Sequence, residues 1–242
     1  DAKTGVEKFA FIPKEKIPAI KSLYDNLAST EPEYGMDLTW TVWRKDGNGD
    51  GLIDSTAGDK LFMYGGMRMG GGNYYALDLT TLTAPKMLFT LTGGSGAYGN
   101  AGQSWSQPVL TDIKVGTEVK KVLVFGGGYD MCYEDGTSCG TTTKGNQIYI
   151  VNAETGELIW WAAGGGAPSA TPAAVNISDM KYSIPSEVKV LDLNSDGLAD
   201  TVYFGDLGGQ LFRMDIDNGK SGTALVKRVK LMPMLTLTWP CL

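Results

Sequence analysis

A run of oxygen-bearing side chains in the last third of the chain is the segment best suited to chemistry. In DLNSDGLAD, residues 192–200, such side chains occupy positions 1, 3, 5 and 9. Calcium takes about six to eight oxygen ligands, and a loop that curls round the ion presents alternate side chains inward while a glycine allows the bend. The spacing therefore predicts a calcium site. Its ligands are Asp192, Asn194, Asp196, Asp200 and the backbone carbonyl of Leu198.

The same run also fits a set of Asx turns that bind no metal. We favour the metal because three carboxylates this close repel one another unless a cation neutralises them. Position 12 is Tyr203 rather than the glutamate of an EF-hand, so we interpret the segment as a similar loop that closes a β-hairpin.

A second loop, DGNGDGLID at residues 46–54, repeats the pattern at the same positions. Its predicted ligands are Asp46, Asn48, Asp50, Asp54 and the carbonyl of Leu52. Its extra glycines make the unbound loop more flexible, so ordering it costs more entropy and we expect weaker calcium binding here. The corresponding hairpin between these two loops, IKVGTE at residues 113–118, lacks the pattern, and we expect it to bind no metal.

The composition argues against several other functions. The chain has no histidine, which excludes Ser/His/Asp and Cys/His nucleophile systems and His-ligated metal sites within it. The glycine runs at 70–72 and 126–128 lack the strand-to-helix setting of a phosphate-binding loop. The net charge is −6, and Lys and Arg form no block that would neutralise a phosphate backbone. We therefore predict that the protein is not an enzyme and has no nucleic-acid partner.

The ends and the hydropathy of the chain bear on its cellular setting. No window approaches the roughly 18 uninterrupted apolar residues that a membrane-spanning helix requires, so we expect no transmembrane segment. The chain opens on Asp1 without a methionine or an apolar signal stretch, and we expect it to be a processed or excised part of a longer protein.

Two of the three cysteines are placed to form a disulfide. Cys132 and Cys139 flank a loop rich in Gly, Asp and Thr and are close enough to bridge without straining the neighbouring strands. A disulfide here implies an oxidising compartment. Cys241 is then either a free thiol or the partner of a cysteine outside this chain.

Three segments of the chain are similar to one another and predict an all-β fold. Residues 39–79, 108–161 and 188–216 each contain short strands rich in Val, Ile, Tyr and Phe, separated by Gly, Asp or Asn, as in an antiparallel meander. We predict a single β-propeller domain over residues 1–242, complete or a partial ring, with long loops and calcium-binding hairpins. An open β-sandwich is the alternative. Residues 7–13 are interpreted as a strand of an earlier blade and residues 224–238 as strands of a later one, and helical periodicity appears only around residues 17–27.

The segment NAETGELIW, residues 152–160, also resembles the repeats of quinone-dependent dehydrogenase propellers. We favour a structural role in blade docking for its tryptophan, because there are only three repeats and no vicinal cysteine pair. Integrin-like propellers, whose hairpins carry similar acidic loops, are a further alternative.

Several motifs, in order, resemble the C-terminal propeller domain of the PilC/PilY family of proteins associated with type IV pilus tips. They are FAFIP (9–13), GGMRMGGGNYYALDLT (65–80), SWSQPVL (104–110), VFGGGYD (124–130), IYIVNAETGELI (148–159) and SIPSEVKVLDLNSDGLADTVYFGDLGGQLFRMDI (183–216). The family's calcium loop falls on residues 192–200. The tail, residues 235–242, matches no part of the family.

The resemblance implies a calcium-binding protein that supports pilus biogenesis, in the balance of extension against retraction, together with twitching motility and surface adhesion. It implies partners at the pilus tip or among the minor pilins, and receptors on host or abiotic surfaces. It also implies export through the periplasm to the cell surface, the pilus tip or the outer membrane.

Overall fold

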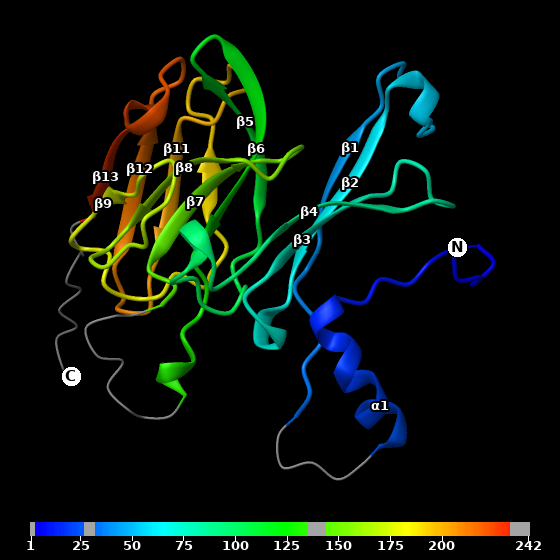
Figure 1. Ribbon diagram of the computed structural model, residues 1–242. Helices are drawn as coiled ribbons and strands as arrows, with labels where there is room; N and C mark the ends of the chain where they lie inside the picture. Colours follow the sequence, from blue (N-terminus) through cyan, green and yellow to red (C-terminus); the bar gives the residue numbers. More distant parts are fainter. Residues whose placement is uncertain (1–2, 27–31, 135–143, 233–242) are drawn as a thin grey trace, which may run out of the picture.

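The computed structural model describes residues 3–26, 32–134 and 144–232 of the chain (Figure 1). Within these residues the strands are β1 (Thr41–Lys45), β2 (Lys60–Gly66), β3 (Tyr74–Asp78), β4 (Lys86–Leu91), β5 (Val109–Val115), β6 (Glu118–Gly126), β7 (Gln147–Asn152), β8 (Leu158–Ala163), β9 (Val175–Asn176), β10 (Lys189–Leu191), β11 (Thr201–Gly205), β12 (Leu211–Ile216) and β13 (Val226–Leu231). The helices are α1 (Ile17–Asp25) and the 3-10 turns η1 (Lys14–Lys16), η2 (Ser55–Ala57), η3 (Arg68–Gly70), η4 (Gly96–Tyr98), η5 (Met131–Tyr133) and η6 (Gly222–Leu225).

The strands form three sheets in chain order: a first sheet β1–β4, a second sheet β5–β9 and a third sheet β10–β13. Neighbouring strands pair antiparallel except β9, which adds to β8 in parallel. The all-β prediction is confirmed, and each of the three predicted repeats corresponds to one sheet. The first and third predicted repeats end at residues 79 and 216, before the fourth strand of their sheets. These fourth strands are β4 and β13.

The second sheet is covered on both faces, and this explains its sequence. Val122 and Val124 are buried in the core cluster shared with the third sheet, whereas Leu123 and Phe125 are buried in the cluster shared with the first. Because successive side chains of a strand point to opposite faces, a strand between two sheets must be apolar at every position. The continuous run VLVF in β6 is the result.

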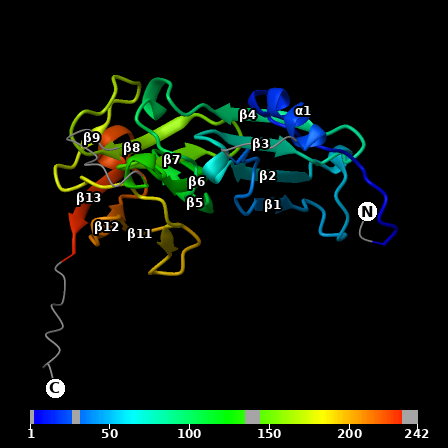
Figure 2. The same ribbon diagram turned by 90° about the horizontal axis from the view of Figure 1, so that it is seen from below.

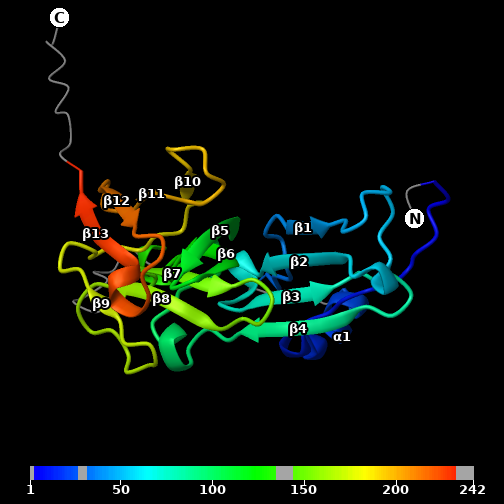
Figure 3. The same ribbon diagram turned by 90° about the horizontal axis from the view of Figure 1, so that it is seen from above.

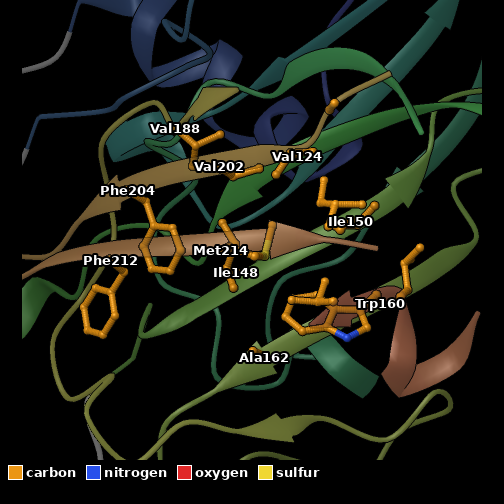
Figure 4. Close-up of a cluster of buried hydrophobic side chains, with 14 of the residues drawn as sticks. Val124, Ile148, Ile150, Trp160, Ala162, Val188, Val202, Phe204, Phe212 and Met214 are labelled. Carbon is orange, nitrogen blue, oxygen red and sulfur yellow. The ribbon is translucent and has the colours of Figure 1, made fainter. Parts of the chain in front are cut away.

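In the third sheet, buried and more exposed residues alternate along β12, because only one face of this sheet packs on the second sheet. Figure 4 shows Val202, Phe204, Phe212 and Met214 facing Ile148 of the second sheet. The rings of Phe204 and Phe212 are parallel, with centroids 5.2 Å apart. Arg213 lies between Phe212 and Met214 and points away from the core, so apolar and polar residues alternate along β12.

The sheets lie side by side as an arc of three propeller-like blades. The first strand of each sheet contacts that of the next, β1 with β5 and β5 with β10. In Figure 3 these strands lie along one side of the arc, whereas the outer strands β4 and β13 lie along the other. Three sheets packed in series differ from a sandwich, which has two. No closed ring forms within the described residues.

The outer hairpin of every blade carries the same irregularity. The register slips by one residue at Leu88 in β4, at Ile159 in β8 and at Lys227 in β13. Such a bulge increases the local twist of the strand. The repeat in the sequence is therefore matched by a repeat in the backbone.

Two predictions at the ends of the chain were wrong. Residues 226–231 form the outer strand of the third sheet rather than part of a later blade. Residues 6–13 have no regular secondary structure, although Phe11 packs its ring on Trp40 and Tyr75 at 6.5 and 5.4 Å between centroids. Figure 2 shows this N-terminal segment and α1 beside the first sheet.

The predicted helix is confirmed as α1, which ends where Asn26 adopts a left-handed conformation with φ 47°. Its side chains are at least partly exposed. None of the helices in the described residues is long and apolar enough to cross a bilayer.

Candidate functional site

The two acidic loops occupy equivalent places in the first and third sheets. Residues 46–59 join β1 to β2, and residues 192–200 join β10 to β11. In the second sheet, Gly116 and Thr117 alone connect β5 to β6. The sequence correctly placed all three hairpins, and the middle one demonstrates that the fold closes this connection without an acidic loop.

In the loop at 192–200, the first and fifth residues organise the backbone. The Asp192 carboxylate accepts the N–H of Ser195 at 2.7 Å on Oδ1 and that of Gly197 at 2.8 Å on Oδ2. Asp196 Oδ1 accepts the N–H of Leu198 at 2.8 Å. Ser195 and Gly197 have φ of 61° and 86°, so the chain makes two left-handed bends. The second bend suits glycine because glycine has no Cβ to clash.

Asp200 closes the same loop from its far end. Its Oδ2 accepts the N–H of Leu193 at 2.8 Å and that of Asn194 at 3.3 Å, while its own N–H donates to the carbonyl of Leu191 at 2.9 Å. The side chain of Asn194 lies between the acids, since its Oδ1 accepts the N–H of Asp196 at 3.0 Å. The structure thus brings the predicted residues 192, 194, 196 and 200 together around one turn of chain.

The loop at 46–54 repeats these contacts atom for atom in its first part. Asp46 accepts the N–H of Gly49 at 2.7 Å and that of Gly51 at 2.9 Å. Asp50 Oδ1 accepts the N–H of Leu52 at 2.8 Å. Asn48 Oδ1 likewise accepts the N–H of Asp50, at 3.1 Å. The letter-for-letter match in sequence is therefore a match in backbone conformation.

The far end of this loop differs, because Asp59 rather than Asp54 closes it. Asp54 points away and caps η2, with Oδ1 accepting the N–H of Thr56 at 2.8 Å. Asp59 is 5% exposed and accepts the N–H of Gly47 at 2.7 Å and that of Asp54 at 2.9 Å. These two bonds, from Asp54 first and then Gly47, lower the pKa of Asp59.

Asp59 lies outside the nine-residue spacing that predicts the ligands from the start of the loop. A different count would have found it. Asp59 directly precedes β2 just as Asp200 directly precedes β11. Counted back from the second strand, the two aspartates are equivalent, and residues 54–58 are an insertion that carries η2.

The third-sheet loop is also bonded to the neighbouring blade. The N–H of Ala199 donates to the carbonyl of Asp112 in β5 at 2.8 Å, and Asn218 Nδ2 donates to the carbonyl of Ala199 at 3.0 Å. The turn after β12 also contacts the middle hairpin, since the N–H of Gly116 donates to the carbonyl of Lys220 at 2.9 Å. The loop end is thus held at the seam between the second and third sheets.

The comparisons with known proteins agree on one group. A type IV pilus biogenesis factor PilY1 homolog of Xylella fastidiosa is 26% identical over 241 residues, which cover 99% of this chain and 16% of that protein. The type IV pilus biogenesis factor PilY1 of Pseudomonas aeruginosa strain UCBPP-PA14 is 26% identical over 224 residues, covering 88% of this chain and 16% of that protein. The chain is similar to PilY1 proteins over most of its length. It spans less than a fifth of the length of these relatives, and no protein-family model matches it.

The fold agrees with the crystal structure of the Pseudomonas aeruginosa PilY1 C-terminal domain. The TM-score is 0.56 at 23% identity, over 88% of this chain and 35% of that chain. The resemblance to the PilC/PilY family that the sequence predicted is confirmed, and the PilY1 domain fits the propeller-like arrangement of the three sheets.

The donor set of the acidic loops fits a hard cation such as calcium. Every candidate ligand is an oxygen, and a carboxylate has about four lone-pair sites, so the N–H bonds to the loop leave acceptor capacity. As they stand, no three His, Cys, Asp or Glu side chains within the described ranges converge into a metal cluster. Binding would therefore require the carboxylates, including Asp59 and Asp200, to turn towards a common point.

The tryptophan motif docks blades, as in our preferred interpretation. Trp160 is buried in the core cluster shared with the third sheet. Trp161, which directly follows the motif, is buried in the cluster shared with the first sheet. Gly156 has φ 75°, and a Cβ on it would lie 2.6 Å from the ring of Phe89 in the first sheet. The glycine therefore allows the turn of the second blade to contact the ring of the first. The NAETG turn thus has a packing role between the first two blades.

Only one cysteine of the predicted disulfide lies in the described residues. Cys132 lies in η5 and is disulfide-bonded, whereas its predicted partner Cys139 lies outside the described residues, as does Cys241. Asp130 holds the base of this loop, since its carboxylate accepts the N–H of Cys132 at 3.1 Å and that of Lys144 at 2.9 Å. The pairing of Cys132 with Cys139 stays a prediction.

Proposed function

We propose that this chain is the calcium-responsive propeller segment of a type IV pilus biogenesis factor, without catalytic activity. Homology to PilY1 supports the association with pilus biogenesis. The calcium proposal rests on a single observation. The first and third blades each carry an acidic loop with the same hydrogen bonds, at the hairpin that the middle blade closes with a tight turn. Because two residues are enough to join β5 to β6, the longer acidic loops at the same connection indicate a role beyond joining the strands.

Asp192, Asn194, Asp196, Asp200 and the Leu198 carbonyl would hold the ion in the third sheet. Asp46, Asn48, Asp50 and the Leu52 carbonyl would hold one in the first, with Asp59 supplementing Asp54. Calcium supplies positive charge that offsets the mutual repulsion of the carboxylates. The protein's own contribution is to pre-form the turn through the N–H bonds to Asp192 and Asp46.

The physiological consequences we propose are those of the PilC/PilY family. The domain would act at the cell surface, exported through the periplasm to the pilus tip or the outer membrane, and would contact minor pilins and surface receptors. Calcium occupancy would set the balance between pilus extension and retraction, and hence twitching motility and adhesion. The Cys132–Cys139 disulfide would suit the oxidising compartment of such a secreted protein.

The test is the substitution Asp196→Ala in the full-length parent protein. We expect loss of calcium binding at this loop by calorimetry, an unchanged far-ultraviolet circular dichroism spectrum, and loss of twitching motility in the bacterium. Glu118→Ala, in the hairpin of the middle blade, is the matched control and should leave both binding and motility unchanged. Normal motility in an Asp196 variant that has lost calcium would refute the switch.

A further inference from the structure

The first strand of the second blade, β5, pairs with β6 along one edge, and the third blade bonds to part of the other edge. The carbonyl of Asp112 accepts the N–H of Ala199 at 2.8 Å, and the carbonyl of Lys114 accepts the N–H of Gly219 at 2.8 Å. The first donor belongs to the acidic loop at 192–200, and the second belongs to the turn after β12. Two separate segments of the third blade therefore bond to the same edge of β5.

Asn218 joins these two segments to each other and to the strand. Its Nδ2 donates to the carbonyl of Ala199 at 3.0 Å, and its Oδ1 accepts the N–H of Lys114 at 2.8 Å. One side-chain amide thus contacts the acidic loop on one side and the neighbouring blade on the other. Ala199 is 1% exposed, and both its N–H and its C=O are bonded at the seam between the second and third blades.

The position of Ala199 matters for calcium because Asp200, the last predicted ligand of the loop, directly follows it. Binding requires the carboxylate of Asp200 to turn towards the ion. A ligand whose backbone is already fixed loses less conformational entropy on binding than a ligand on a free segment of chain. The bonds that hold Ala199 therefore prepare the end of the loop for calcium, although Asn218 is not a ligand.

The acidic loop of the first blade has no such connection. In the part of the chain that the structure describes, the hydrogen bonds of residues 46–59 all stay within the first blade. Asp59, which closes this loop, accepts the N–H groups of Gly47 and Asp54 from the loop itself. The two acidic loops share a backbone conformation but differ in their contact with a second blade. The loop of the first blade is therefore an internal control.

We propose that Asn218 is a positioning residue for the acidic loop at 192–200, and that it couples calcium occupancy of this loop to the seam between the second and third blades. The inference rests on the calcium binding proposed above. Coupling between two equilibria is reciprocal, so the closed seam raises the calcium affinity by the same factor by which calcium opposes opening of the seam. One net hydrogen bond corresponds to about a 2- to 10-fold change in an equilibrium constant, and we expect a coupling factor of this size.

The experiment is a calcium titration of the 242-residue chain, followed by the amide NMR shifts of one glycine in each loop. The N–H of Gly197 donates to Asp192 and reports the loop of the third blade. The N–H of Gly51 donates to Asp46 and reports the loop of the first blade. Each loop thus has its own calcium midpoint in one sample.

Asn218→Ala removes both side-chain bonds at the seam. It should raise the calcium midpoint at Gly197 by about 2- to 10-fold and leave the midpoint at Gly51 unchanged. The matched control is Lys220→Ala, at an exposed position in the same turn. It should shift neither midpoint, because Lys220 contributes its backbone carbonyl to the seam and the substitution keeps that group.

A second readout uses the wild-type chain alone. Saturating calcium should slow the hydrogen exchange of the Lys114 and Gly116 amides, which bond to the third blade, by about 2- to 10-fold. The amide of Gly127 bonds to the carbonyl of Gln147 within the second blade and should exchange at an unchanged rate. The comparison separates an effect at the seam from a general stabilisation of the chain, which would slow all three amides.

The possible results distinguish this inference from the calcium proposal on which it rests. A wild-type chain without a calcium response at Gly197 would overturn both. A calcium response at Gly197 with the same midpoint in Asn218→Ala, or unchanged exchange at Lys114 and Gly116, would overturn the coupling and leave calcium binding in place. Equal shifts at Gly197 and Gly51 in Asn218→Ala would also overturn the coupling, because a general loss of stability affects both loops.

Discussion

Asp59 and Asp200 perform the same structural task in different blades: each directly precedes the second strand of its sheet and accepts the N–H of the second residue of its acidic loop. The two distances are 2.7 Å from Gly47 and 2.8 Å from Leu193. Asp54, which matches Asp200 in the sequence pattern, caps a 3-10 turn instead. The two loops are thus equivalent in geometry through residues that a count along the loop does not align.

This equivalence predicts which substitutions weaken calcium binding. Asp59→Ala should reduce the affinity of the first loop more than Asp54→Ala does, because Asp54 is engaged with Thr56 outside the turn. Asp200→Ala should cost more than Asp54→Ala, since it removes the closing residue of the more rigid loop. Titration calorimetry of the three variants measures this order. An Asp54 variant that loses as much heat as the other two would contradict it.

The lowered pKa of Asp59 predicts a pH dependence of the first loop. A free aspartate has a pKa of about 3.9, and the N–H bonds from Asp54 and Gly47 lower it in the folded protein. Stabilisation by the carboxylate is therefore complete above the unfolded value and is lost as the pH falls through the folded value. The amide chemical shifts of Gly47 and Asp54, which donate to Asp59, should report a transition below pH 4 or so.

Asp59→Asn retains a side-chain oxygen that can accept one of these bonds but does not titrate near this pH. The transition at the Gly47 and Asp54 amides should therefore disappear in this variant. Its persistence would assign the titration to another group in the loop.

The contact between Gly156 and Phe89 predicts a sensitive position at the seam of the first two blades. Gly156→Ala would place a Cβ 2.6 Å from the ring at a backbone φ of 75°. We expect a loss of about 1–3 kcal/mol in unfolding free energy, as for other overpacked sites. Gly165→Ala has open space around it and should change stability by less than about 0.5 kcal/mol. Denaturant unfolding compares the two.

The cysteine prediction is checked by mass. If Cys132 pairs with Cys139, the intact protein without reductant should be lighter than the reduced protein by two hydrogens, and peptide mapping should recover the two residues in one linked fragment. Alkylation of Cys139 in the native, unreduced protein would contradict the pairing.

Much of this architecture follows from the sequence because its signals are local. The spacing of the aspartates predicts the acidic loops. The apolar runs around Val124 and Ile150 are typical of buried strands, and both residues are buried. β4 was harder to predict, because the bulge at Leu88 breaks the two-residue period that identifies a strand. β13 was expected as a strand but was assigned to a later blade. Asp59 was beyond a pattern search, since an insertion separates it from the residues with which it acts.

The hydrogen bond from Ala199 to Asp112 has a mechanical consequence. It joins the last part of an acidic loop to a strand of the neighbouring blade, at the rim where both hairpins project. A force that pulls the third blade from the second must break this bond while the loop is still anchored by Asp200. We therefore expect the force needed to separate the second and third blades to depend on the rigidity of the loop. A more rigid loop should raise that force.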